Sequence, residues 1–98
     1  MVVRVQGEVD VATAPRMGET LNRLLGRGER VVLDLRHVDF MDLHGLAVLM
    51  RATRRAHAEG GSFAIDRPAP CVRRLVGLVH AEGELRVLPD GTDPLHAA

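Results

Sequence analysis

Residues 31–35 read Val31-Val32-Leu33-Asp34-Leu35, a nearly continuous apolar run with the length of a β-strand. A strand that is apolar on both of its faces is typical of a parallel sheet that is covered on each side. The run therefore predicts the central strand of a parallel sheet, and the remaining elements can be placed around it.

Three helical patterns surround this strand. The first has Thr13 as a candidate N-cap and ends near Gly26, and its apolar residues share one helix face: Met17, Leu21, Leu24 and Leu25. The second is expected over residues 43–59 and ends at Gly60. The third begins near Pro68 and Pro70, and its expected apolar face is Val72, Leu75, Val76 and Val79.

Shorter strand patterns alternate with these helices. Strands are expected from residue 3, with a kink at Gly7 and the alternation resuming at Val9 and Val11, and over residues 63–65 and 85–88. Residues 10–15 are expected to form a loop. Strands that alternate with helices imply crossover connections and a mostly parallel sheet. We therefore expect one small α/β sandwich over residues 1–98, ordered from about residue 2 to 89, with a frayed tail over residues 90–98.

The composition excludes several classes of function. All 13 basic residues are arginine, and 13 acidic residues balance them, which disfavours a nucleic-acid binder driven by net charge. Ser62 is the only serine and has no G-x-S-x-G context, so a serine hydrolase is disfavoured. We expect no enzymatic activity. Without a membrane-spanning apolar run, a signal peptide or a cysteine partner for Cys71, a soluble cytoplasmic protein is expected.

Residues 34–46 are the most informative segment and are expected to form a loop between the buried strand and the second helix. Asp42 stands at the N-cap position, where its carboxylate can accept hydrogen bonds from the amides of His44 or Gly45. Gly45 permits close approach of a ligand or another backbone. The positive end of the helix dipole would favour an anion at this turn.

In this segment the sequence resembles the STAS domain family of anti-sigma factor antagonists. The resemblance covers nearly the whole chain, and the order and spacing of its pieces carry it: residues 7–10, 12–15, 32–35, 38–42, 45–49, 60–61 and 72–75. It implies a STAS-like mixed, mostly parallel sheet with helices mainly on one face. It also implies a binding module without cofactor or metal, whose partner is an anti-sigma factor, a serine-protein kinase of the ATP-binding kinase fold.

The resemblance further implies which residues contact that partner. They lie in the first loop, in the segment around Asp42 and in the first turn of the second helix: Glu8, Asp10, Thr13, Asp39, Asp42, Leu43, His44, Gly45 and Leu46. In the family the kinase phosphorylates the residue directly after the aspartate, and phosphorylation ends the binding. The resemblance therefore implies a role in partner switching, in which the antagonist binds the anti-sigma factor and the sigma factor is released.

Three departures from the family pattern alter these expectations. Leu43 occupies the phosphoacceptor position, where the family has serine or threonine, and it cannot accept phosphate. The usual strand before residues 2–5 is missing, which leaves an open sheet edge that favours a homo-oligomer. His80 stands where the family tends to have glycine.

Other interpretations stay open from the sequence. The domain could be a phosphorylation-independent scaffold or subunit of a stressosome-type or transporter-associated assembly. His44 could accept phosphate or titrate as a switch, although a surface histidine is the simpler interpretation. Asp34, Asp39 and Asp42 could hold magnesium only if their side chains converge, and Cys71 is best read as a small core residue.

Overall fold

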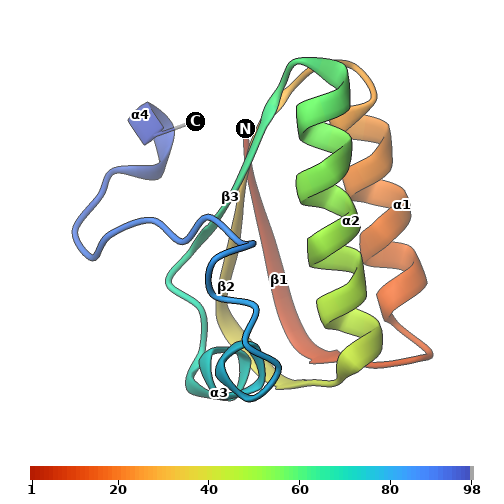
Figure 1. Ribbon diagram of the computed structural model, residues 1–98, viewed down its shortest axis with the longest axis vertical. Helices are drawn as coiled ribbons and strands as arrows, with labels where there is room; N and C mark the ends of the chain where they lie inside the picture. The colour runs from red at the N-terminus through yellow and green to blue at the C-terminus, as the bar shows by residue number, and fades with distance from the viewer. Residues whose placement is uncertain (98) are drawn as a thin grey trace.

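The computed structural model describes residues 1–97, and its strands and helices alternate as predicted (Figure 1). The elements are β1 (Val2–Val9), α1 (Ala14–Leu25), β2 (Arg30–Met41), α2 (Leu43–Glu59), β3 (Ser62–Asp66), α3 (Pro70–Leu78) and α4 (Pro94–Ala97). None of the helices in this part of the chain has the length and hydropathy that a membrane span requires.

The three strands form one sheet in the order β1-β2-β3, with β2 in the centre. Both strand pairs are parallel, and α1 and α2 lie side by side on one face of the sheet (Figure 1). The predicted mostly parallel sheet with helices mainly on one face is confirmed. The antiparallel component that the resemblance implied is not part of the described sheet.

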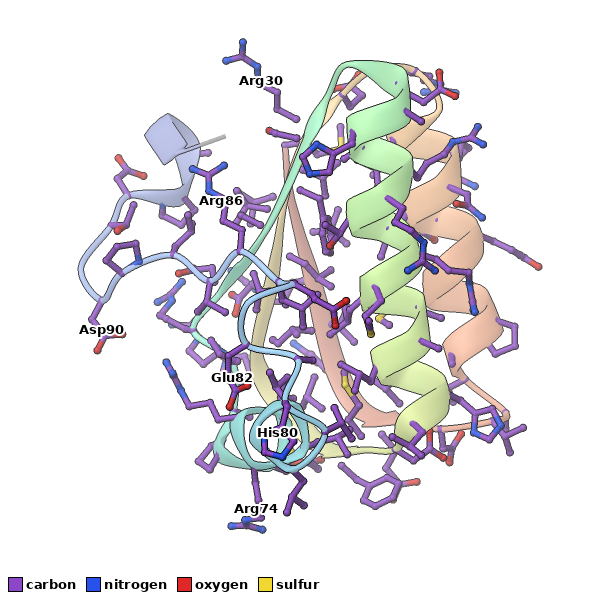
Figure 2. All side chains as sticks on the ribbon, viewed as in Figure 1. Arg30, Arg74, His80, Glu82, Arg86 and Asp90 are labelled. Carbon is purple, nitrogen blue, oxygen red and sulfur yellow. The ribbon has the colours of Figure 1, made fainter. Side chains whose placement is uncertain are left out.

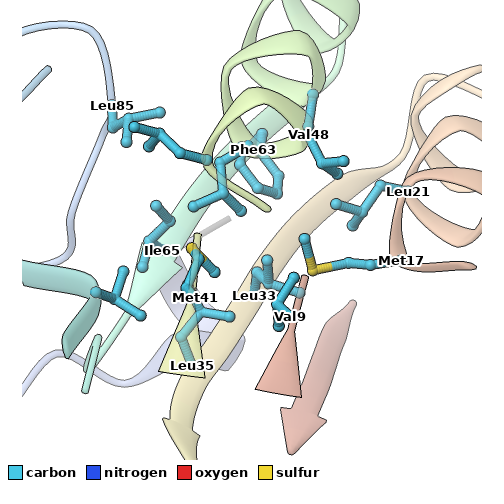
Figure 3. Close-up of a cluster of buried hydrophobic side chains, with 14 of the residues drawn as sticks. Val9, Met17, Leu21, Leu33, Leu35, Met41, Val48, Phe63, Ile65 and Leu85 are labelled. Atoms are coloured by element: carbon cyan, nitrogen blue, oxygen red, sulfur yellow. The ribbon is translucent and has the colours of Figure 1, made fainter. Parts of the chain in front are cut away.

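β2 is buried on both faces, which explains its uninterrupted apolar sequence. Val31, Leu33 and Leu35 are fully buried in the main core with side chains of α1 and α2 (Figure 3). Val32 belongs to a second, smaller cluster with Ala64 and Leu88. Because side chains alternate along a strand, this second cluster lies on the face of the sheet opposite the main core.

The two long helices form where the sequence predicts them. α1 buries the four predicted core residues, Met17, Leu21, Leu24 and Leu25. α2 spans the predicted residues and ends at Gly60, whose φ of +74° is the left-handed conformation that favours glycine at this position. Local sequence signals therefore set the limits of the helical layer.

The predicted end of the central strand was wrong. Residues 34–41 were expected in a loop, but β2 continues to Met41 because β1 pairs with it as far as Val9. The first strand ends at Val9, and the expected loop begins at Asp10 with a turn that closes with a hydrogen bond from Thr13 N to Asp10 O (3.2 Å).

The C-terminal part of the chain differs most from expectation. The predicted strand over residues 85–88 is reduced to one parallel bridge between Ile65 and Val87. Two hydrogen bonds hold it, from Ile65 N to Arg86 O and from Leu88 N to Ile65 O, both 2.8 Å. Val79, expected on the apolar face of the third helix, is exposed.

The tail and the sheet edge bear on two further predictions. Residues 94–97 form a short helix, α4, whereas Ala98 lies outside the described residues; the expected fraying of residues 90–98 stays a prediction. β1 has a strand neighbour on one side only, so it is an edge strand of the described sheet. Oligomerisation through this edge also stays a prediction.

Candidate functional site

The candidate site lies at the carboxyl ends of β1 and β2, where the chain enters α2. The last register pair of the two strands is Val9 with Met41, and Asp42 N donates a hydrogen bond to Val9 O (3.1 Å). This bond places the loop after β1 directly beside the start of α2. The two sequence segments that were predicted to form one surface are therefore neighbours.

Asp42 caps α2 as predicted. Its Oδ1 accepts hydrogen bonds from His44 N (2.9 Å) and Gly45 N (3.4 Å), and its Oδ2 lies 3.4 Å from His44 Nδ1. Burial opposes ionisation and raises the pKa of Asp42, but the hydrogen bonds from His44 and Gly45 outweigh it and hold the pKa below its ordinary value. The positive end of α2 thus already has an anionic cap of its own.

The loop after β1 is held by reciprocal hydrogen bonds. Asp10 Oδ1 accepts from Ala12 N (2.9 Å) and Thr13 N (3.1 Å). Thr13 Oγ1 accepts from Asp10 N (2.9 Å) and donates to Glu8 O (2.8 Å). Thr13 occupies the N-cap position of α1, but its hydroxyl does not cap the helix. Its hydroxyl instead fixes the shape of the loop, which corrects the predicted capping role.

Exposed apolar side chains gather around this turn. The exposed fractions are 64% for Val11, 48% for Phe40 and 61% for Leu43. Large apolar side chains are usually buried, so a group of exposed ones beside a hydrogen-bonded turn makes this end of the sheet the candidate site. The sequence analysis singled out Leu43 for its position only, and missed Val11 and Phe40.

Two irregularities in β2 explain why Phe40 is exposed. The register with β1 shifts once between Asp34 and His37 and again between Val38 and Phe40, each time adding one residue to β2. Each extra residue changes which side chains point into the core. The second shift therefore turns Phe40 outward and Met41 inward, and it leaves Asp39 exposed.

Gly45 and Leu46 are buried below this surface. Leu46 is 3% exposed, and a Cβ on Gly45 would lie 2.8 Å from both Met41 Cγ and Val9 Cγ1. Gly45 therefore allows the first turn of α2 to pack closely against the strand ends; Val9 and Met41 lie in the core in Figure 3. These two residues support the surface from within, whereas Leu43 and His44 are exposed on it.

A groove between α1 and α2 opens beside the turn. Its volume is about 420 Å³, and Val11 and His44 line its end nearest the turn. Ala14, Gly18 and Ala47 line it further along the helices. The surface around Asp42 therefore continues into a shallow cleft with small side chains.

Two buried carboxylates lie elsewhere in the sheet; the sequence analysis considered one of them, Asp34, only as a possible metal ligand and missed the other, Asp66. Asp34 and Asp66 are 1% and 2% exposed and face each other in register on β2 and β3. Arg67 bridges them, with Nε 3.0 Å from Asp66 Oδ2 and an NH2 nitrogen 3.8 Å from Asp34 Oδ2. Arg4 and Arg36 also approach Asp34, at 3.5 and 3.6 Å.

This network shows that the three candidate metal ligands have different structural roles. Asp34 is paired with arginines inside the sheet, whereas Asp42 caps α2. Across residues 1–97, no group of three or more histidine, cysteine, aspartate or glutamate side chains could hold a metal ion. The magnesium interpretation of Asp34, Asp39 and Asp42 therefore has no geometric support.

The Asp42 cap gives a first testable prediction. Because the folded protein lowers the pKa of Asp42, its charge stabilises the fold above the unfolded pKa, about 3.9, and this contribution is lost as the pH falls through the folded pKa. We expect Asp42→Ala to lower the urea midpoint at pH about 7, and the deficit to shrink at pH about 3. Asp42→Asn retains a cap oxygen but does not titrate. At neutral pH its urea midpoint should therefore lie closer to that of the parent protein than the midpoint of Asp42→Ala does.

Comparison with known proteins agrees with this geometry. The family model described as "Mlab, STAS domain" matches residues 1–89. The anti-sigma F factor antagonist of Paenibacillus polymyxa is 29% identical over 91 residues, which are 91% of this chain and 75% of that protein. The prediction that the chain is a binding domain and not an enzyme agrees with this relative.

Solved structures show the same fold. An anti-sigma factor antagonist from Mycobacterium paratuberculosis is 28% identical, with a TM-score of 0.79, and the match covers 98% of this chain and 82% of that chain. The STAS domain of a SulP transporter from Vibrio cholerae is 26% identical, with a TM-score of 0.62 over 90% of this chain and 71% of that chain. By its family match, its sequence relatives and its fold, the chain belongs to the STAS-domain family.

Proposed function

We propose that this protein is an anti-sigma factor antagonist that acts in partner switching. Two of the similar proteins carry that name. On this proposal, the chain binds an anti-sigma factor of the ATP-binding kinase fold in the cytoplasm and thereby releases a sigma factor. It acts by occupying its partner, without a reaction of its own.

The observation that carries the proposal is the apolar group Val11, Phe40 and Leu43 at the end of the sheet. Four carboxylates from the neighbouring segments border it: Glu8, Asp10, Asp39 and Asp42. Interfaces of this kind have an apolar centre and a polar rim. A partner that fits would offer an apolar pocket surrounded by arginine or lysine side chains. We call these seven residues, with Thr13 and His44, the docking surface.

Leu43 determines how this binding would be regulated. It is the first residue of α2, directly after the Asp42 cap, and its side chain is exposed. The resemblance places the phosphoacceptor hydroxyl at this position, and leucine has none. We therefore infer that phosphorylation at this position does not end the complex, and that Leu43 adds apolar contact area instead.

The test is a binding experiment with the kinase-fold anti-sigma factors encoded in the source genome. The protein is immobilised, each candidate is captured in purified form, and ATP with magnesium is added. We expect capture of one candidate and no release after ATP. Release by ATP together with a phosphate on the docking surface would contradict the inference about Leu43, and failure of every candidate to bind would contradict the proposed function.

A matched variant makes the result interpretable. Leu43→Ser restores a hydroxyl at the first position of α2 without changing the Asp42 cap. If the kinase site of the partner accepts this turn, the variant should gain one phosphate by mass spectrometry and dissociate when ATP is added. The parent protein should remain unmodified under the same conditions.

A second candidate function is a subunit or scaffold role that does not involve phosphorylation. The similarity to the STAS domain of a SulP transporter favours it, and the edge strand β1 would suit assembly into an oligomer. Light scattering separates a monomer from an oligomer. Co-purification with a membrane transporter complex, and not with an anti-sigma factor, would favour this second function.

A further inference from the structure

The outer surface of the helical layer carries a concentration of arginines. All six are exposed, and they come from α1 and its following turn and from α2: Arg16, Arg23, Arg27, Arg51, Arg54 and Arg55. α1 and α2 lie side by side (Figure 1), and each helical segment carries three of these arginines. Arg51 lines the groove between the two helices, whereas Arg16 lies on the side of α1 nearer β1. We call these six residues the arginine face.

The neutral net charge of the chain hides a strong asymmetry. The segments 14–27 and 43–59 contain six arginines and only two acidic residues, Glu19 and Glu59, which gives a formal charge of +4. The rest of the chain contains seven arginines and eleven acidic residues, which gives −4. The helical layer is therefore strongly positive, whereas the docking surface at the end of the sheet is acidic.

Most of the arginine face is without an internal counter-charge. Within residues 1–97, Arg55 is the only one of the six to form an ion pair, with its Nε 3.6 Å from Glu59 Oε1. By contrast, Arg4 and Arg36 of the sheet and Arg67, directly after β3, all pair with Asp34. Exposed guanidinium groups without an internal carboxylate keep all their donors for an external anion.

The surroundings of these arginines limit which anion fits. Single-stranded nucleic acid would need aromatic platforms, but of the two aromatic residues, Phe63 is buried and Phe40 lies on the docking surface. A membrane-binding helix would need large apolar side chains beside the charges. Over the described α1 and α2, Leu43 at the first turn is the only exposed large apolar residue.

We propose that the arginine face is a second interaction surface, which binds a carboxylate-rich surface of another protein. Arginine matches carboxylates through paired hydrogen bonds, and electrostatic complementarity mainly sets the rate and specificity of such contacts. The face adjoins the docking surface at the groove that Val11, His44 and Arg51 line, and it is opposite to that surface in charge. The domain could thus hold a basic partner at the sheet end and an acidic partner on its helices.

The test uses a fluorescein-labelled oligoglutamate peptide and the full chain at low ionic strength. We expect binding that weakens as salt is added. The double variant Arg51→Gln with Arg54→Gln should bind about fivefold more weakly, as expected for two exposed charge contacts. The matched control is Arg73→Gln with Arg74→Gln on α3, which removes the same charge; Arg74 lies at the end of the molecule away from most of α2 (Figure 2).

Each outcome decides the proposal. Loss of binding in the α2 variant but not in the α3 control supports it, whereas equal loss in both, or no binding, overturns it. Tighter binding to heparin or to phosphatidylglycerol vesicles, with the same dependence on Arg51 and Arg54, would assign the face to polyanions or membranes instead. Salt-sensitive self-association that requires the same arginines, without peptide binding, would make a second copy of this chain the occupant.

Discussion

Replacing Arg67 with alanine is expected to lower the free energy of unfolding by about 2 kcal/mol, less than for a fully buried ion pair, because the Arg67 side chain is 45% exposed. The guanidinium of Arg67 bridges Asp34 and Asp66, which are buried and adjacent on neighbouring strands. Without it, two carboxylates would remain next to each other away from water. Arg4 and Arg36 limit the loss further, because they still approach Asp34. Urea unfolding at neutral pH measures it.

Two controls separate the charge from the backbone. Arg67 has a φ of +45°, so its backbone is in the left-handed region; Arg67→Gly relieves that strain and should be less destabilising than Arg67→Ala by about 1 kcal/mol. In an Asp66→Asn background, Arg67→Ala should cost clearly less, because one of the two carboxylates is gone. An unchanged cost in that background would assign the effect of Arg67 to packing.

The fold could be predicted because its signals are local. The apolar run over residues 31–35, the helical spacing of the α1 core residues and the glycine at the end of α2 each depend on neighbours in sequence. Residues 85–88 carry a similar strand pattern, but only Val87 bridges to β3. An apolar run favours a strand, whereas its pairing also depends on which neighbours the rest of the chain brings to it.

The candidate site, too, could be predicted only where its features depend on neighbours in sequence. The Asp42 cap was predictable, since an N-cap bonds to amides two and three residues further along the chain. The exposure of Phe40 was not, because it depends on two register shifts between β1 and β2 that no local pattern reveals. Likewise, Asp34 was interpreted as the end of a strand, and its ion pairs were missed. The arginines that pair with it, Arg4 and Arg67, are thirty or more residues away in sequence.

Replacing Phe40 with alanine is expected to weaken binding of the anti-sigma factor about 30-fold, which corresponds to about 2 kcal/mol for a central aromatic side chain at an interface. Phe40 is 48% exposed in the free domain, so a partner can bury the other half of its ring. A calorimetric titration with the purified partner measures the affinity. Leu95→Ala is the matched control, because Leu95 is also exposed but lies in α4, away from the docking surface.

The effect of Phe40 must be separated from a loss of folding. Phe40 is about half-buried in the free domain, so the thermal midpoint of Phe40→Ala is compared with that of the parent protein, and the affinity is measured at temperatures well below both midpoints. Leu43→Ala should weaken binding in the same direction, since Leu43 is exposed at the adjacent turn. If Phe40→Ala and Leu43→Ala both bind like the parent while Leu95→Ala does not, the contact lies elsewhere. The partner would then have to recognise a different face of the domain, and the acidic residues around Asp42 would serve only to shape the turn.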